Sequence, residues 1–238
     1  MNKLQNPPLI LMIALFIFST SYSSGAQDSL KRPLVTSDMA DYIRQAMVVP
    51  GKKMVELKIL IPDLIYDIRY ASLNNFMHRY MYAKGSYRCF LRKDAALALK
   101  NAQDILKVKG YGLKIFDAYR PYSVTVKFWE LVKDERYVAN PAKGSGHNRG
   151  VAVDLTIVEL TTGKELDMGT GFDNFTDTAH HNFKDLAESV LKNRNILRQT
   201  MEQAGFKALE TEWWHYSLPA AANYELLDLP FKKLKKRS

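Results

Sequence analysis

Apolar residues recur at nearly every second position in two short segments, which predicts β-strands there. In the segment 55–61, apolar residues largely alternate with polar ones, and Pro62 follows. This period is typical of a strand with one buried face, and proline ends such a strand because it lacks a backbone N–H donor. Leu113 and Ile115 predict a second strand, which ends before Pro121 because proline restricts the backbone of the preceding residue.

Three other segments have the 3.6-residue period of amphipathic helices. Residues 94–109 are rich in Ala, Leu and Lys and precede Gly110, a residue favoured just beyond a helix end. Ser123 is suited to cap a helix that continues to Val132, and another helix is predicted over 185–204. The predicted apolar stripes of these two helices comprise Val124, Phe128, Leu131 and Val132, and Leu186, Val190, Leu197 and Met201. Because helices do not alternate regularly with strands, the pattern favours the α+β class over a doubly wound sheet.

The first 26 residues have the features of a secretory signal peptide. Lys3 precedes the uncharged apolar run 9–18, and the small residues at 24–26 offer a cleavage site. The run has about half of the roughly 20 residues that a transmembrane helix needs. An uncleaved membrane anchor is the alternative. We therefore expect an exported protein, periplasmic or secreted, without stable membrane insertion once the signal is removed.

Beyond the signal peptide, the composition predicts one folded domain. The chain has 47% hydrophobic and 25% charged residues, close to ordinary globular proteins, and shows no internal repeat or linker. We expect a loosely held N-terminal arm over 27–50 and the folded domain over 51–228. The single cysteine, Cys89, cannot form an intrachain disulfide and is expected to be a buried, unreactive thiol.

A basic tail over 229–238 carries a large share of the positive charge. The formal net charge is +9, and the last seven positions contain Lys232, Lys233, Lys235, Lys236 and Arg237. We expect a solvated tail, with attraction to acidic lipid or wall polymer as the alternative. Because an exported protein rarely meets nucleic acid, this charge does not indicate nucleic-acid binding.

A glycine-rich turn and the strand after it contain a histidine and an aspartate with metal-binding side chains. After Gly150, apolar residues alternate along 151–157, so Asp154 projects from a strand whose opposite face is buried. His147 precedes the strand in a turn that allows its imidazole to fold back toward the carboxylate. A surface aspartate with an incidental histidine is the alternative.

A second candidate segment lies further along the chain and consists of Glu212, Trp213, Trp214, His215 and Tyr216. Adjacent tryptophans are costly to expose, so we expect this segment to pack into the fold and to desolvate Glu212 and His215. A regular strand would direct these two side chains to opposite faces, whereas a helical turn or a bent strand end would bring them together.

One metal ion would provide partners for both segments. Buried carboxylates and imidazoles need such partners. His147, Asp154 and His215 offer three N or O ligands, and with a fourth position open to water they match the geometry of catalytic zinc.

Several short motifs between about residues 50 and 220 occur together in one known family, in the same order along the chain. One is the pattern Ser-x-His-x-x-Gly-x-Ala-x-Asp at 145–154, followed by Glu-x-x-His at 212–215. The others are Tyr70-Ala71 with Asn74-Asn75-Phe76, Asp117-Ala118-Tyr119-Arg120-Pro121, Asp167-Met168-Gly169-Thr170 with Phe172-Asp173, and Glu212-Trp213-Trp214-His215-Tyr216. In these motifs the chain resembles the D-alanyl-D-alanine dipeptidases, which are zinc D,D-peptidases.

The resemblance implies a fold and a metal centre. The fold is the hedgehog/D,D-peptidase type, an α+β domain whose antiparallel sheet has flanking helices. The implied zinc ligands are His147, Asp154 and His215, which hold one ion per chain. Glu212 is the implied catalytic base, and it is expected to take a proton from water and return it to the departing amine.

The resemblance also implies residues that contact or orient the substrate. Arg120 is expected to polarise the scissile carbonyl, and its guanidinium stays charged in a dry site. An ion pair with Asp117 is a structural alternative that does not exclude this role. Ser145, Asp173 and Asp117 are the candidate substrate-binding residues. Gly146 departs from the family pattern, because close relatives commonly carry an arginine there.

We therefore expect an enzyme that hydrolyses the D-alanyl-D-alanine dipeptide to two D-alanines in cell-wall metabolism. One alternative is a D,D-carboxypeptidase or endopeptidase that acts on longer muropeptides, and another is a non-catalytic module that holds zinc. The expected partner is the small dipeptide, and the oligomeric state is left open. The adjacent His180 and His181 are expected to be polar surface residues, because neighbouring side chains diverge and cannot readily share an ion.

Overall fold

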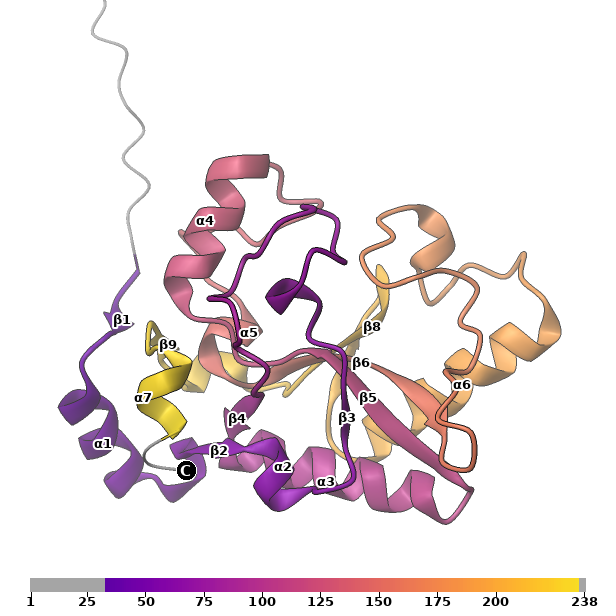
Figure 1. Ribbon diagram of the computed structural model, residues 1–238, viewed down its shortest axis with the longest axis horizontal. Coiled ribbons are helices and arrows are strands. Elements are labelled where there is room, and N and C mark those ends of the chain that lie inside the picture. The colour runs from indigo at the N-terminus through magenta and orange to yellow at the C-terminus, as the bar shows by residue number, and fades with distance from the viewer. Residues whose placement is uncertain (1–32, 236–238) are drawn as a thin grey trace, which may run out of the picture.

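A five-stranded sheet lies at the centre of the computed structural model, which describes residues 33–235 (Figure 1). The strand order is β3-β5-β6-β8-β7, and all neighbours except β3 and β5 are antiparallel. The strands are β3 (Ile65–Tyr66), β5 (Tyr111–Asp117), β6 (Ala152–Glu159), β8 (Glu212–Ser217) and β7 (Lys207–Leu209). The predicted α+β class is confirmed, but the sheet is mixed rather than wholly antiparallel. The long connection between β3 and β5 returns the chain to the same end of the sheet, so these two strands run in parallel.

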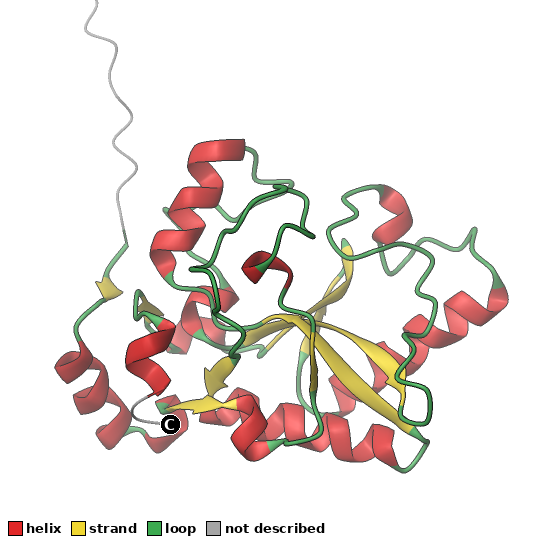
Figure 2. Ribbon diagram, viewed as in Figure 1, coloured by secondary structure: helices red, strands yellow, loops and turns green. Residues whose placement is uncertain are grey.

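Two long helices cover one face of this sheet and lie below it in Figure 2. They are α3 (Lys93–Lys107) and α6 (Glu188–Gln203), which agree closely with the helices predicted over 94–109 and 185–204. Their buried stripes include Ala95, Leu99, Ala102 and Leu106 in α3 and Val190, Leu197 and Met201 in α6. Burying one leucine side chain stabilises the fold by about 1.5–3 kcal/mol, so these stripes hold both helices to the sheet.

The opposite side of the sheet carries the long loops, α4 (Tyr122–Val132) and the short α5 (Gly146–Arg149). The predicted capping role of Ser123 is wrong, because α4 begins after Pro121 and no side chain caps it. Instead, the backbone N–H and the hydroxyl of Ser123 both donate to Asp228, at 2.9 and 2.7 Å. The predicted apolar stripe of this helix is also only partly right, since Leu131 is exposed whereas Phe128 is buried.

The strand predicted over 55–61 is only half formed. β2 (Met54–Glu56) pairs with β4 (Phe90–Arg92), and the chain then turns into α2 (Leu57–Leu60). Leu57 and Ile61 are both buried, whereas Ile59 is 61% exposed. Leu57 and Ile61 are four residues apart, so they would also lie on the same face of a helix. Tertiary packing selects the helix for this part of the segment.

The N-terminal arm and the basic tail are ordered where they are described, which corrects the expectation of a loose arm. Lys232, Lys233 and Lys235 of the tail are exposed to solvent, as predicted. β1 (Val35–Thr36) pairs in parallel with β9 (Leu226–Leu227), and α1 (Met39–Val48) packs beside α7 (Phe231–Lys235). Both ends contribute to a small second core of buried residues, which consists of Tyr42, Met54, Phe90, Tyr119, Leu227, Leu229 and Leu234. This burial orders the two ends, because apolar surface is removed from water.

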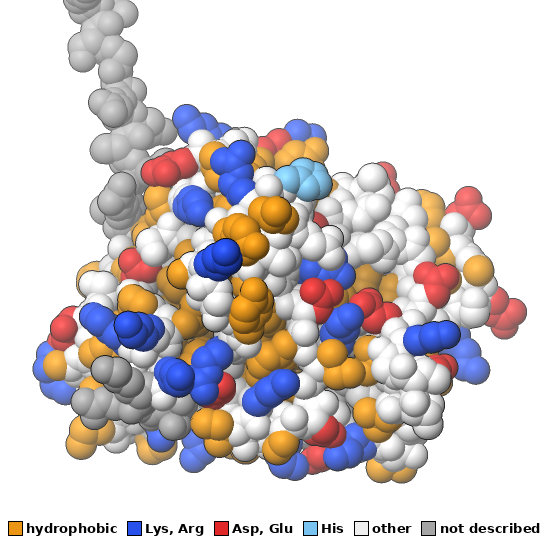
Figure 3. All heavy atoms as spheres, in the orientation of Figure 1, with side chains coloured by type: hydrophobic (Ala, Val, Ile, Leu, Met, Phe, Trp, Pro, Cys, Tyr) orange, Lys and Arg blue, Asp and Glu red, His pale blue; other side chains and the backbone are white. Residues whose placement is uncertain are grey.

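The main core lies between the sheet and its helices. It includes buried side chains from β5, β6, β7, β8, α3, α4 and α6, and also Cys89. Burial raises the pKa of the Cys89 thiol well above its usual range, as expected of an unreactive cysteine. On the face shown in Figure 3, Lys and Arg side chains lie interspersed with acidic and apolar ones rather than in a single patch.

Within residues 33–235, no helix has the length and apolar character needed to cross a bilayer. The predicted signal peptide over 1–26 and the end of the basic tail lie outside the described residues.

Candidate active site

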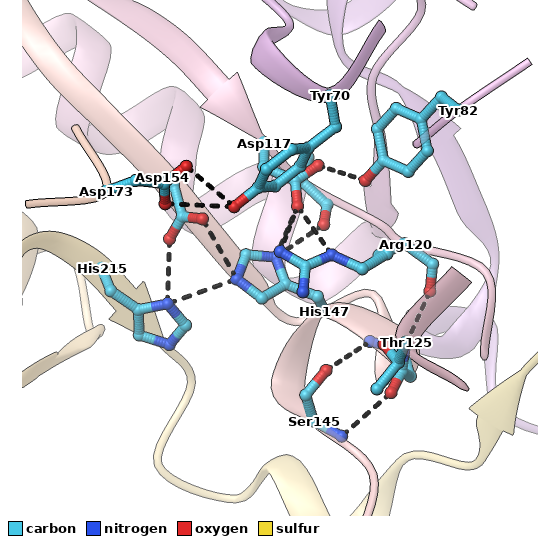
Figure 4. A network of polar contacts seen from close by, with 12 residues as sticks. Tyr70, Tyr82, Asp117, Arg120, Thr125, Ser145, His147, Asp154, Asp173 and His215 are labelled. Carbon is cyan, nitrogen blue, oxygen red and sulfur yellow. Dashed lines mark hydrogen bonds and ion pairs between the residues drawn. The ribbon is translucent and has the colours of Figure 1, made fainter. Parts of the chain in front are cut away.

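The structure brings the three predicted metal ligands together (Figure 4). His147 lies in α5, Asp154 in β6 and His215 in β8. Nε2 of His147 lies 3.2 Å from Nδ1 of His215 and 3.4 Å from Oδ2 of Asp154, and Nδ1 of His215 lies 2.9 Å from Oδ1 of Asp154. Ligands about 2.0–2.1 Å from a tetrahedral zinc ion lie about 3.4 Å from each other, so the two imidazoles and the carboxylate are close enough to share one such ion. His147 and Asp154 are buried, and His215 is partly buried.

Strand register explains how distant parts of the chain reach one point. Asp154 lies directly opposite His215 on β8 and opposite Asp117 on β5. Directly paired residues of an antiparallel sheet project to the same face, so these side chains are neighbours. Ser145 and Asn148 form a reciprocal cap at the start of α5, and Gly150 adopts a left-handed conformation with φ of 70°. That tight turn directs the imidazole of α5 back over β6.

Hydrogen bonds prepare the ligands for a cation. Nδ1 of His147 lies 2.8 Å from the carbonyl oxygen of Ala118. A carbonyl only accepts, so Nδ1 donates and Nε2 keeps its lone pair for a metal. Burial alone would raise the pKa of Asp154, but the adjacent imidazoles, His147 first, lower it well below its usual range. The carboxylate is therefore ionised, as a metal ligand must be.

Glu212 lies beside the three ligands, with its carboxylate 4.0 Å from Nδ1 of His215. The register between β7 and β8 shifts between Ala208 and Leu209, so β8 does not follow a regular pleat here. A regular strand would direct Glu212 and His215 to opposite faces. The bulge changes the direction of these side chains, so both can face the same site. Burial raises the pKa of Glu212, while the nearby His215 opposes this shift. A raised pKa suits a group that both accepts and donates a proton.

Arg120 forms the predicted ion pair and also lines the cavity, so the two expectations for this residue are compatible. Its Nε and Nη2 donate to one oxygen of Asp117 at 3.0 and 2.7 Å. The guanidinium carbon also lies 5.0 Å from the ring centroids of Tyr70 and Phe128. Burial alone would lower the pKa of Arg120, but the charge of Asp117 raises it, so the side chain is a fixed cation in a dry site.

Asp117 is 1% exposed and is not among the residues that line the cavity. Its other oxygen accepts a hydrogen bond from the hydroxyl of Tyr82. This placement fits a role in holding Arg120 better than the predicted contact with substrate. Asp154 is paired with Asp117 across β5 and β6, so both carboxylates lie near the guanidinium of Arg120 and the histidine rings. The opposite charges of these buried groups offset one another.

Asp173 and Ser145 both line the cavity, as expected of substrate-binding residues. The hydroxyl of Tyr70 donates to both oxygens of Asp173, at 3.1 and 3.2 Å. Burial, followed by the charge of Asp154, raises the pKa of Asp173 well above its usual range. A positive group on a ligand would offset this cost and favour the ionised carboxylate. Ser145 also accepts from the backbone of Asn148, so it supports α5 as well.

The cavity beside these residues has a volume of about 250 Å³. Pockets for drug-sized ligands have about 300–1,000 Å³, so this one suits a smaller molecule. Sequence reasoning missed the cavity-lining roles of Tyr70, Tyr137 and Phe175. Tyr70 and Phe76 lie in family motifs, but nothing in the local sequence around Tyr137 and Phe175 signals their position.

His180 and His181 lie outside the cluster of possible metal ligands, as predicted, but the expectation of a surface pair is wrong for His181. Its side chain is 9% exposed, and its ring packs against Tyr216 with centroids 6.1 Å apart. Burial and then the charge of Arg198 lower the pKa of His181 from 6.5 to about 4.

This burial makes the stability of the fold depend on pH. Below pH 6.5 the unfolded chain binds a proton at His181 that the folded chain binds only near pH 4. The free energy of unfolding should therefore decrease as the pH falls from 6.5 toward 4, by up to about 3 kcal/mol from this group. Urea denaturation at pH 7 and pH 4.5 should show a smaller decrease for His181→Gln than for the wild type. The same substitution at the exposed His78 is the matched control, and an equal pH dependence in all three proteins would contradict the assignment.

Comparisons with known proteins point to one family. A family profile described as D-Ala-D-Ala dipeptidase matches residues 51–236. A D-alanyl-D-alanine dipeptidase of Escherichia coli (strain K12) is 37% identical over 175 residues, which cover 74% of this chain and 89% of the relative. Another from Enterococcus faecalis is 34% identical over 171 residues and covers 64% of this chain and 85% of the relative.

Two of the solved structures with partial similarity each cover more than half of this chain. An LD-carboxypeptidase described for its peptidoglycan recognition has a TM-score of 0.36 and 24% identity, and covers 62% of this chain and 69% of its own. VanYB in complex with D-alanine-D-alanine has a TM-score of 0.37 and 17% identity, and covers 58% of this chain and 78% of its own.

Proposed function

The chain belongs to the D-Ala-D-Ala dipeptidase family of metallopeptidases, and from this premise we propose that it hydrolyses the D-alanyl-D-alanine dipeptide to two D-alanines in peptidoglycan metabolism. The metal of the proposal is one zinc ion per chain, held by His147, Asp154 and His215. The observation that carries the proposal is the convergence of these three ligand atoms within 4.8 Å of one another, beside the partly buried Glu212 and the buried Arg120.

A zinc ion in this position supplies Lewis-acid chemistry, which makes water more acidic and polarises a carbonyl group. Glu212 accepts a proton from the attacking water, whose oxygen forms a bond to the peptide carbonyl carbon. The C–N bond then breaks, and Glu212 returns the proton to the departing amino group. Arg120 donates hydrogen bonds to the carbonyl oxygen as negative charge develops there, and Asp117 holds the guanidinium in place for this.

The small cavity favours a dipeptide over the longer muropeptides of the alternative function. Asp173 provides a negative group for the free ammonium of a dipeptide, and Tyr70 orients that carboxylate. The alternative of a non-catalytic zinc-holding module is disfavoured, because a binding role alone does not require both Glu212 and Arg120 beside the metal position. Glu212, Arg120 and Asp173, the proposed acid–base, electrostatic and binding groups, all line this cavity.

We also propose that the protein is exported and acts in the periplasm or outside the cell. The support is the sequence of residues 1–26, where Lys3, the apolar run 9–18 and the small residues 24–26 follow the order of a signal peptide. Peptidoglycan lies outside the cytoplasmic membrane, so the proposed location and the proposed substrate class are consistent.

Metal removal should abolish the activity. We expect purified protein to contain about one zinc ion per chain, and treatment with a chelator should eliminate hydrolysis of D-alanyl-D-alanine until zinc is restored. Asp154→Asn should lose metal content and activity together, because one ligand loses its charge. The exposed Asp104→Asn, in an i,i+4 pair with Lys100, is the matched control and should retain both. Full activity in metal-free protein would refute the proposed mechanism.

A further inference from the structure

Three aromatic residues from three different loops meet at the edge of the cavity. We call Phe76, Phe175 and Tyr137 the aromatic bridge. The ring of Phe175 contacts Phe76 and Tyr137 edge to face, with centroids 5.1 Å apart in both pairs. All three residues line the cavity and are also exposed, at least in part, to solvent. They therefore lie where the cavity meets the solvent.

The bridge connects three loops that border the cavity. Phe76 belongs to the loop between β3 and β4, Tyr137 to the loop after α4, and Phe175 to the loop between β6 and α6. These loops lie on the same side of the sheet in Figure 1. Because Phe175 is the central member, its removal would break both contacts, whereas removal of Tyr137 would break only one.

The loop that carries Phe76 is anchored close to this residue. The amide of Asn75 donates to three backbone carbonyls, of Arg69, Ser72 and Arg79, and the adjacent Phe76 stacks on Phe128 of α4. Such a buried amide rigidifies a loop, because each lost hydrogen bond would leave an unsatisfied polar group.

The other two loops have local hydrogen bonds beside their aromatic residues. Arg136 binds Asp134 through several hydrogen bonds beside Tyr137. Asn174 accepts from the backbone and hydroxyl of Thr176 on either side of Phe175. These bonds lie within each loop, so the ring contacts of Phe175 are the interactions that link these loops to each other.

The position of Phe175 relates the bridge to one end of the substrate. Phe175 follows Asp173 by two residues, and Asp173 is the proposed partner of the substrate ammonium. In a longer muropeptide that ends in D-alanyl-D-alanine, the additional residues extend from this amino end. They would have to pass the place where the three rings meet.

We propose that the aromatic bridge sets the length specificity of the enzyme by closing the cavity on the amino side of the dipeptide. This inference rests on the proposed function. The bridge excludes amino-extended substrates sterically, while the small dipeptide fits within the cavity of about 250 Å³. The two edge-to-face contacts of Phe175 hold the three rings in this arrangement.

The test compares kcat/KM for D-alanyl-D-alanine with kcat/KM for a pentapeptide that ends in the same dipeptide. In zinc-loaded Phe175→Ala, the ratio of pentapeptide to dipeptide activity should rise at least tenfold relative to the wild type. Tyr137→Ala should raise it less, because one ring contact remains. Tyr87→Ala removes an aromatic residue that is 58% exposed and does not line the cavity, so it is the matched control and should leave the ratio unchanged.

A binding measurement separates this inference from the proposed function. In a Glu212→Gln background, calorimetry should show at least tenfold tighter pentapeptide binding when Phe175→Ala is added. If folded Phe175→Ala and Tyr137→Ala show an unchanged activity ratio and unchanged pentapeptide binding, the proposed role of the aromatic bridge is overturned. If Phe175→Ala does not fold, Tyr137→Ala decides by the same criteria, because this side chain is 39% exposed. A wild type without dipeptide activity would overturn the proposed function, and the binding comparison would still test the bridge.

Discussion

Glu212→Gln should reduce kcat for D-alanyl-D-alanine by about 10²- to 10⁴-fold, the usual contribution of a positioned general base. Glutamine retains the size and polarity of the side chain but cannot accept the proton from water. The carboxylate lies 4.0 Å from a ring nitrogen of His215, in a partly buried position. Steady-state kinetics with the zinc-loaded variant measure the effect.

Metal content and thermal stability show whether the loss arises from the base itself. Both should remain close to wild-type values, because Glu212 is not one of the three converging ligands. Glu210→Gln is the matched control, since this residue is exposed and pairs with Arg198 on the surface. Retention of more than a tenth of the wild-type kcat in Glu212→Gln would show that another group accepts the proton.

Arg120→Lys should lower kcat by about 10²- to 10³-fold, equivalent to about 3–4 kcal/mol of barrier, the typical effect of losing one oxyanion donor. Lysine keeps the positive charge but lacks the planar fork that binds Asp117 through Nε and Nη2. It also cannot reproduce the contact of the guanidinium with the rings of Tyr70 and Phe128. The charge would therefore be present but poorly aimed at the developing oxyanion.

The expected signature of Arg120→Lys is a fall in kcat at nearly constant KM, because the interaction strengthens only in the transition state. Zinc content should be preserved, and Arg79→Lys at an exposed position is the matched control. A variant that loses only substrate affinity would instead assign Arg120 to ground-state binding. The melting temperature distinguishes both outcomes from a general loss of the fold.

Local pattern was sufficient where an element depends mainly on its own residues. The helices predicted over 94–109 and 185–204 formed nearly as expected, because their apolar stripes and end signals agree with each other. The burial of Trp213 and Trp214 followed in the same way from the cost of exposing large apolar rings.

Local pattern failed where contacts between distant segments decided the result. The segment 55–61 contains both a strand period and a helical pair, and packing selected α2 for its second half. The two chain ends became ordered because β1 pairs with β9 and because both ends bury apolar residues together. His181 was placed inside by the chain segment around Glu210, a contact that its polar neighbours in sequence do not indicate.

For this protein, the amino-acid sequence indicated the α+β class and the residues that converge on one metal position, since the metal-binding side chains in two segments and the family motifs around them point to the same three residues. Only the tertiary structure decided how Glu212 comes to the side of His215, why Asp117 faces Arg120 rather than the cavity, and which aromatic rings border that cavity. The physical reason is that strand register, bulges and loop contacts depend on pairing between residues far apart in the chain, and such pairing leaves no local period in the sequence.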